Sequence, residues 1–107
     1  MTERWKVEYV LHILENGAAV RYFVTSEDRQ CAPHEKIGLE YDITTPERIG
    51  PTKVKIVEVE KCAQGYPFFA RIRAQVTTRH PDILSEWLVQ NGLQEISGKE
   101  IENLGIL

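Results

Sequence analysis

The residues of this chain with the greatest capacity for chemistry are two cysteines, Cys31 and Cys62, and three histidines, His12, His34 and His80. Cys31 and His34 have the spacing of half a zinc site, but a structural zinc site needs four ligands, usually from two such pairs. The other candidates stand singly in the sequence. Neither a metal nor another cofactor is therefore predicted, and two cysteines do not indicate a disulfide framework.

Nucleophilic catalysis by either cysteine would need a histidine in contact with it in space, which spacing alone does not establish. Cys62 falls in an expected turn, where water is hard to exclude. The sequence contains no Gly-x-Ser-x-Gly, Walker or His-Glu-x-x-His motif. Neighbouring carboxylates such as Glu58 and Glu60 are typical of solvated strand faces. Catalysis is not predicted.

Basic and aromatic side chains gather on one side of an expected hairpin at residues 53–77. Segment 51–80 carries six basic and two acidic residues, whereas segment 81–107 carries one basic and five acidic. An aromatic ring among cations on an open sheet can hold single-stranded nucleic acid through stacking and phosphate contacts. The candidate binding residues are Lys53, Lys55, Phe69, Arg71, Arg73 and Gln75.

The same charges also have an ordinary structural interpretation. Arg71 would face Glu58 in a cross-strand pair, and the acidic C-terminal segment could pack beside the basic hairpin. The net charge of −3 argues against a general nucleic-acid binder. The leading hypothesis is therefore a small non-catalytic binding or adaptor domain that contacts a protein partner. A nucleic-acid-binding module that uses the basic face is the alternative.

The elements that must position these side chains are β-strands. Residues 68–77 alternate apolar with polar side chains, a period of two that predicts a half-buried strand. A turn at residues 62–65 joins it to a strand at residues 53–60. The alternation of that strand breaks near Ile56, which predicts a β-bulge.

A second hairpin is expected at the start of the chain, where a strand from Trp5 to Leu14 leads into Asn16-Gly17. This dipeptide suits a type I′ turn. The register that it predicts places Val10 opposite Phe23 on the outer face, as an apolar spot that a neighbouring element or another copy of the chain could cover. Val10 and Phe23 are thus the candidate residues for self-association into a homodimer. An edge strand at residues 36–44, or alternatively at residues 5–14, would also offer unpaired backbone groups for self-association.

The remaining segments connect and cover these strands. Residues 26–35 are expected to form a loop, residues 37–43 a strand, and residues 45–48 one helical turn. Pro81 begins a helix that ends near Gly92. Ser97 and Glu100 match a capping box, which predicts a short helix over residues 98–104, with an edge strand at residues 104–107 as the alternative.

Together these elements predict one α+β domain over residues 1–107. It has a curved antiparallel sheet, or a partly open small β-barrel, of about five strands: two hairpins plus a middle strand. One C-terminal helix and a short terminal helix cover it. The composition, 42% hydrophobic and 27% charged, is ordinary for such a core.

The stretch Glu35-Lys36-Ile37-Gly38-Leu39-Glu40-Tyr41-Asp42-Ile43, followed by a hairpin, resembles small β-barrels of the SH3-like or PUA-like kind. This likeness concerns the fold and implies no function. No apolar run reaches the length of a membrane span, and no apolar segment follows Met1. We therefore expect a cytoplasmic protein without a membrane partner.

Overall fold

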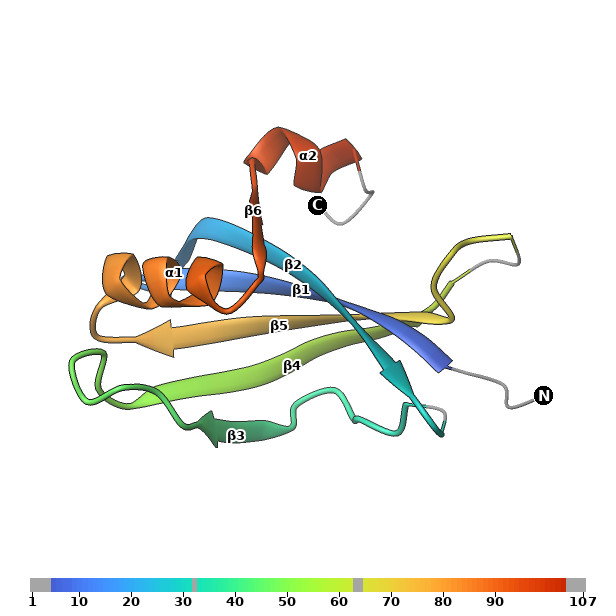
Figure 1. Cartoon of the computed structure of the whole chain (residues 1–107), viewed down its shortest axis with the longest axis horizontal. Helices are drawn as coiled ribbons and strands as arrows, with labels where there is room; N and C mark the ends of the chain where they lie inside the picture. The colour runs from blue at the N-terminus through green and yellow to red at the C-terminus, as the bar shows by residue number, and fades with distance from the viewer. Residues whose placement is uncertain (1–4, 32, 63–64, 104–107) are drawn as a thin grey trace.

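The computed structural model of the chain describes residues 5–31, 33–62 and 65–103. It shows an α+β fold in which a curved, open sheet carries two helices (Figure 1), so the predicted fold class is confirmed. The elements are β1 (Trp5–Glu15), β2 (Ala18–Arg29), β3 (Glu40–Ile43), β4 (Thr52–Lys61), β5 (Ala70–Thr78), α1 (Pro81–Gln90), β6 (Gln94–Ile96) and α2 (Gly98–Asn103).

The strands follow the order β3-β4-β5-β1-β2-β6 in one six-stranded sheet. Both predicted hairpins, β1–β2 and β4–β5, are present as antiparallel pairs. They meet in the middle of the sheet through β1 and β5, which run parallel, so the sheet is mixed rather than wholly antiparallel. The sheet does not close into a barrel, and β3 and β6 are its two edges.

The first hairpin has the predicted turn but a different register. Asn16 and Gly17 both have positive φ, 53° and 81°, as a type I′ turn requires. A bulge after Ile13 then shifts the pairing by one residue. β2 also continues to Arg29, through residues predicted to form a loop, because β1 begins at Trp5 and pairs with it.

The second hairpin contains the predicted bulge, which lies between Ile56 and Glu58. Its register is shifted by two residues, so Glu58 pairs with Arg73 instead of Arg71. The connection is longer than predicted, since the Cys62 N–H already donates to the Phe69 carbonyl at 2.9 Å. Residues 63 and 64 of the predicted turn lie outside the described residues. A shift of two residues leaves Val59 and Ile72 on the core side, as predicted.

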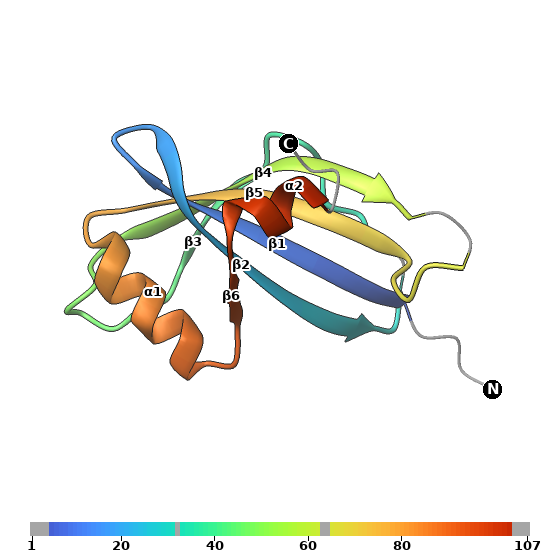
Figure 2. The ribbon, with the colours of Figure 1, turned by 90° about the horizontal axis from the view of Figure 1, so that it is seen from above.

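The helices cover opposite faces of the sheet, as the buried residues show. Leu84 and Leu88 of α1 belong to the larger core cluster, which also contains Ile13 and Phe23. Ile101 of α2 packs with Val10 and Ile96 in a second cluster. Figure 2 shows α2 lying above the strands, with α1 to one side of them.

Local signals for both helices are confirmed. Pro81 stands in the first turn of α1, and Gly92 follows its end with a φ of 88°. The capping box of α2 is formed, because the Glu100 N–H donates to Ser97 Oγ and the Ser97 N–H donates to Glu100 Oε1, both at 3.2 Å. None of the described helices is both long and apolar enough to cross a membrane.

The segments around β3 agree in part with the predictions. β3 begins at Glu40 rather than at residue 37. The single helical turn predicted at residues 45–48 is present slightly later in the chain, where the Ile49 and Gly50 N–H groups both donate to the Pro46 carbonyl. Ile49 is fully buried, which anchors this turn to the core. The edge strand considered for residues 104–107 lies outside the described residues.

Candidate binding cleft and open sheet edge

The predicted basic face lies opposite α1, but its arginines have acidic partners. Arg71 is only 8% exposed, and its Nε lies 2.7 Å from Glu8 Oε1. Arg73 forms an ion pair with Glu58. Because these guanidinium groups are held by carboxylates of neighbouring strands, the face is a network of paired charges rather than a stripe of open cations.

The other residues predicted for this face are also flanked by neighbours of the fold. The register places Lys53 and Lys55 beside Asp42 and Glu40 of β3, and Gln75 opposite Lys55. Phe69 packs edge-on against Trp5, with 4.5 Å between ring centroids. Its ring is therefore held against another aromatic side chain.

Val10 and Phe23, the residues predicted for self-association, do not lie opposite each other. The bulge after Ile13 pairs Val10 with Val24, and both Val10 and Phe23 are fully buried within the chain, on opposite faces of the sheet. The predicted pairing of Val10 with Phe23 is wrong, since a one-residue slip exchanges the faces of a strand, whereas Val10 is covered by a neighbouring element, α2. This slip buries the Phe23 ring and leaves the neighbouring Tyr22, with its hydroxyl, half-buried.

The structure does not gather the cysteines and histidines into a metal site. Within the described parts of the chain, no group of three or more His, Cys, Asp or Glu residues could hold a metal ion. Cys31 is exposed. Burial raises the pKa of Cys62, which keeps its thiol protonated at neutral pH.

A cleft opens on the α1 face of the sheet, beside the helix. It consists of two adjoining hollows of about 440 and 260 Å³ that share Tyr9 and Tyr41. The outer hollow is also lined by Arg29, His34, Glu35, Lys36, Leu39 and Ile56. The inner one is lined by Leu11, Thr25, Glu27, Ile43, Val54, Val76, Leu84 and Leu88. The floor is thus largely apolar, and the charges lie mainly at the outer end.

Curvature of the sheet creates this cleft. The end of β2 faces the segment before β3, where Arg29 forms an ion pair with Glu35; both side chains are 15% exposed. We call this pair the Arg29–Glu35 clasp. The Arg29 guanidinium also lies 5.5 Å from the Tyr9 ring centroid and 3.6 Å from Glu27 Oε1. The clasp therefore joins two segments that are not adjacent in the sheet, across the outer end of the cleft.

The surroundings of Tyr41 in the cleft keep its phenol uncharged. Burial raises the pKa of Tyr41, and the carboxylates of Glu35 and Glu27 raise it further, against the opposing effect of Arg29. The Tyr41 phenol is therefore neutral at physiological pH. Arg29 balances the nearby carboxylates, although Glu35 Oε2 is buried and has no hydrogen-bond partner in the described structure.

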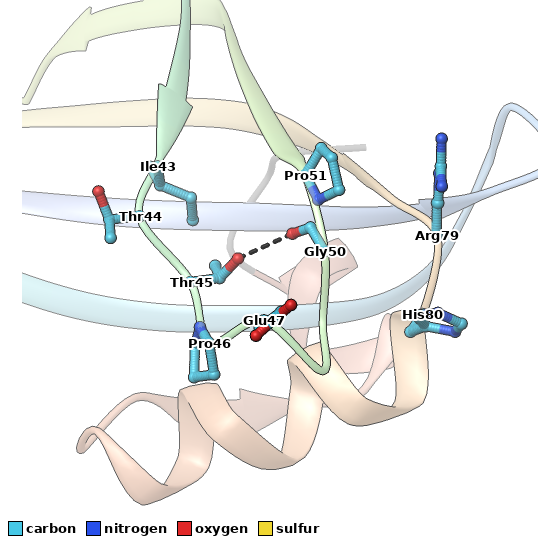
Figure 3. A pocket seen from close by; sticks show the side chains of 9 residues that line it. All are labelled: Ile43, Thr44, Thr45, Pro46, Glu47, Gly50, Pro51, Arg79 and His80. Atoms are coloured by element: carbon cyan, nitrogen blue, oxygen red, sulfur yellow. Dashed lines mark hydrogen bonds between the residues drawn. The ribbon is translucent and has the colours of Figure 1, made fainter.

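A further hollow, of about 510 Å³, lies between the β3–β4 loop and the start of α1 (Figure 3). The Thr45 hydroxyl donates to the Gly50 carbonyl at 2.8 Å, so this group closes the loop. Figure 3 shows Arg79 and His80 on the wall opposite Thr45, with the Arg79 side chain directed away from the loop. The polar groups do not converge, which makes this hollow a weaker binding candidate than the cleft.

The mouth of the cleft adjoins the open edge of the sheet. β3 pairs with β4 on one side, and no strand formed by the described residues lies on the other. Large apolar side chains along this edge are exposed: Ile37 at 67%, Leu39 at 46% and Tyr41 at 42%. The prediction that residues 36–44 contain an edge strand is therefore confirmed, while the first strand of the chain, β1, is central.

Sequence reasoning missed the cleft residues, although one signal was present. Thr25, Glu27 and Arg29 continue the alternation of β2 and place one polar side chain after another on the cleft side. No sequence pattern around Glu35 indicates its role, because its partner Arg29 becomes a neighbour only through the curvature of the sheet.

Comparisons with protein-family models, with curated proteins and with solved structures found no match to this chain. The features of the molecule that indicate a function are therefore the geometry of the cleft and the β3 edge.

Proposed function

We propose that this chain is a small non-catalytic binding domain that receives an extended segment of a protein partner along β3. The observation that carries the proposal is an edge strand flanked by exposed apolar side chains. Edge strands direct alternate backbone N–H and C=O groups outward, and peptide-binding domains use such groups to add a strand.

The cleft supports this mode of binding because it lies beside the same strand. Tyr41 and Ile43 point to the cleft side of β3 and line it. Alternate side chains of an added strand would point to that side too. Since the inner hollow is mostly apolar and the Tyr41 phenol is neutral, apolar side chains suit these positions.

The state of the polar groups supports binding rather than catalysis. Arg29 and Glu35 are engaged with each other, and burial raises the pKa of the Cys62 thiol. We do not advance nucleic-acid binding as a second function, because Arg71 and Arg73 are paired with Glu8 and Glu58.

A synthetic peptide in which valine and threonine alternate tests the proposal. Added to ¹⁵N-labelled protein, it is expected to shift the backbone amide signals of residues 40–43, with a dissociation constant on the order of 0.1–1 mM for so short a strand. The same peptide with N-methylated backbone amides is the matched control, since it cannot form the ladder.

Two results would contradict the proposal. One is equal binding of the N-methylated peptide, which would show that backbone pairing plays no part. The other is a set of shifts confined to residues 94–96, at the β6 edge. Leu39→Ala should weaken binding without changing the fold, because Leu39 is 46% exposed.

A further inference from the structure

We infer that the segment received by β3 is basic on the side that faces away from the cleft, with lysine or arginine at alternate positions, and that it comes from a different protein rather than from a second copy of this chain. The inference rests on the proposed function and specifies the chemistry of the partner. It is carried by the arrangement of charge on the sheet face opposite α1.

Charges of opposite sign alternate from strand to strand on this face. In one row, Glu8 of β1 bonds to Arg71 of β5, which lies opposite Glu60 of β4. In the next row, Arg73 forms an ion pair with Glu58. Opposite charges in neighbouring strands attract, so each strand complements the one beside it.

Opposite charges also pair between β4 and β3, and at the open edge these pairs end on acidic residues. Lys55 lies opposite Glu40, and Lys53 lies opposite Asp42. Glu40 and Asp42 are both exposed, and β3 is the last strand on this side. A strand added beside β3 would continue the pattern if it placed cations next to these two carboxylates.

The cleft side of β3 sets the other half of the pattern. Tyr41 and Ile43 lie on this side, and the exposed Leu39 lines the outer hollow. The charges at that end are already balanced by the Arg29–Glu35 clasp. Apolar residues are therefore expected on the cleft side of the added strand, so that basic and apolar residues alternate along it.

A second copy of β3 does not match this pattern. If two copies pair antiparallel with Tyr41 opposite Tyr41, Glu40 of each lies opposite Asp42 of the other. A shift of two residues can place Asp42 opposite Asp42. A shift of one moves a carboxylate to the apolar side. The three antiparallel registers that overlap most of β3 thus oppose like charges or place an acid on the apolar side, and like charges directly opposite each other are destabilising.

Three peptides of equal length test the inference: valine alternating with lysine, with threonine, or with glutamate. The lysine peptide is expected to bind about tenfold more tightly than the threonine peptide, and the glutamate peptide about tenfold more weakly. High salt should reduce both differences, because the pairs are exposed. A scrambled lysine–valine peptide is the control for charge without alternation.

The double variant Glu40→Gln/Asp42→Asn identifies the surface. It should bind the lysine and threonine peptides equally, because only the two edge carboxylates distinguish them. Glu86→Gln/Glu102→Gln is the matched control; it removes two exposed charges from the helices and should leave the tenfold preference intact.

The outcomes separate the inference from the proposed function. If the threonine peptide binds at β3 as tightly as the lysine peptide, the inference fails and the proposed function stands. If no peptide shifts the signals of residues 40–43, the proposed function fails. Sedimentation should show a 12.3 kDa monomer. A dimer whose formation shifts the signals of residues 40–43 would overturn the choice of a different protein.

Discussion

The two edges of this sheet are built in opposite ways. β6 has three residues, and the capping box of Ser97 and Glu100 starts α2 directly after it. Ile96 and Ile101 are buried there, at 7% and 0% exposure. β3 has four residues, and the segment that leads into it leaves Ile37 and Leu39 exposed.

This difference indicates which edge supports the fold and which is available to a partner. Natural proteins protect sheet edges, because unpaired backbone groups promote association with other chains. Here α2 packs Ile101 over Ile96 of β6 on one face of the sheet, and we call β6 the covered edge for this reason, while apolar side chains remain exposed along β3. Contiguous exposed apolar side chains are typical of interaction sites. The covered edge should therefore contribute mainly to stability and the open edge mainly to binding.

The largest expected effect is on the covered edge. Ile101→Ala should lower the free energy of unfolding by about 3 kcal/mol, because it leaves a cavity in the small cluster with Val10 and Ile96. Leu39→Ala on the open edge should cost less than about 0.5 kcal/mol, since this side chain is half exposed. Urea denaturation measures both. Equal losses would mean that the two edges do not differ in this way.

The second prediction compares one ion pair near each edge. Arg29→Ala should cost about 2 kcal/mol, because it leaves the mostly buried Glu35 carboxylate without its partner. Arg21→Ala should cost less than about 1 kcal/mol, since the Arg21–Glu95 pair beside β6 is more exposed, at 31% and 38%.

A second substitution shows whether the Arg29 effect comes from an uncompensated charge. Arg29→Ala/Glu35→Gln should recover part of the lost stability, because the buried carboxylate is removed as well. If the double variant is as unstable as the sum of the two single ones, the Arg29–Glu35 clasp contributes through packing alone.

The sequence predicted the elements better than their partners. The alternation predicted over residues 68–77, the Asn16-Gly17 turn and the Ser97–Glu100 capping box each depend on near neighbours. The turn and the capping box were confirmed, and so was the alternation from Ala70 onward, where β5 begins. The bulge near Ile56 was also predicted, because it interrupts an alternation that can be read along one strand.

The bulge after Ile13 could not be predicted in the same way. The predicted and the observed register of that hairpin both place apolar residues on one face. Only the packing of the whole core decides whether Tyr22 or Phe23 is buried beneath α1, and it buries Phe23. The parallel pairing of β1 with β5 and the approach of Arg29 to Glu35 are likewise long-range. The cleft arises from these long-range contacts, so patterns among neighbouring residues in the sequence could not predict the candidate site.

The smallest expected effect is a pH dependence on the covered side of the sheet. His12 is 7% exposed, its ring lies edge-on to Tyr22 at 5.3 Å, and Nε2 is buried with no hydrogen-bond partner among the described residues. Burial lowers the pKa of His12 below its usual 6.5, and the positive charge of Arg73 lowers it further. The folded protein therefore binds a proton at this site less readily than the unfolded chain does.

Because the pKa of His12 is lower in the folded state, its contribution to the free energy of unfolding is fully present above pH 6.5. This contribution is lost as the pH falls, until His12 is protonated in the folded state as well. His12→Gln should flatten the dependence of the urea midpoint on pH between 7 and 5, whereas His34→Gln, at an exposed position, should not.

Tyr22 packs against the cluster under α2, so amide exchange at residues 94–103 should rise at low pH before exchange at residues 40–43 changes. If amide exchange at β3 instead rose first as the pH fell, this prediction would be contradicted. The stability of the open edge, and not of the covered edge, would then depend on the protonation of His12.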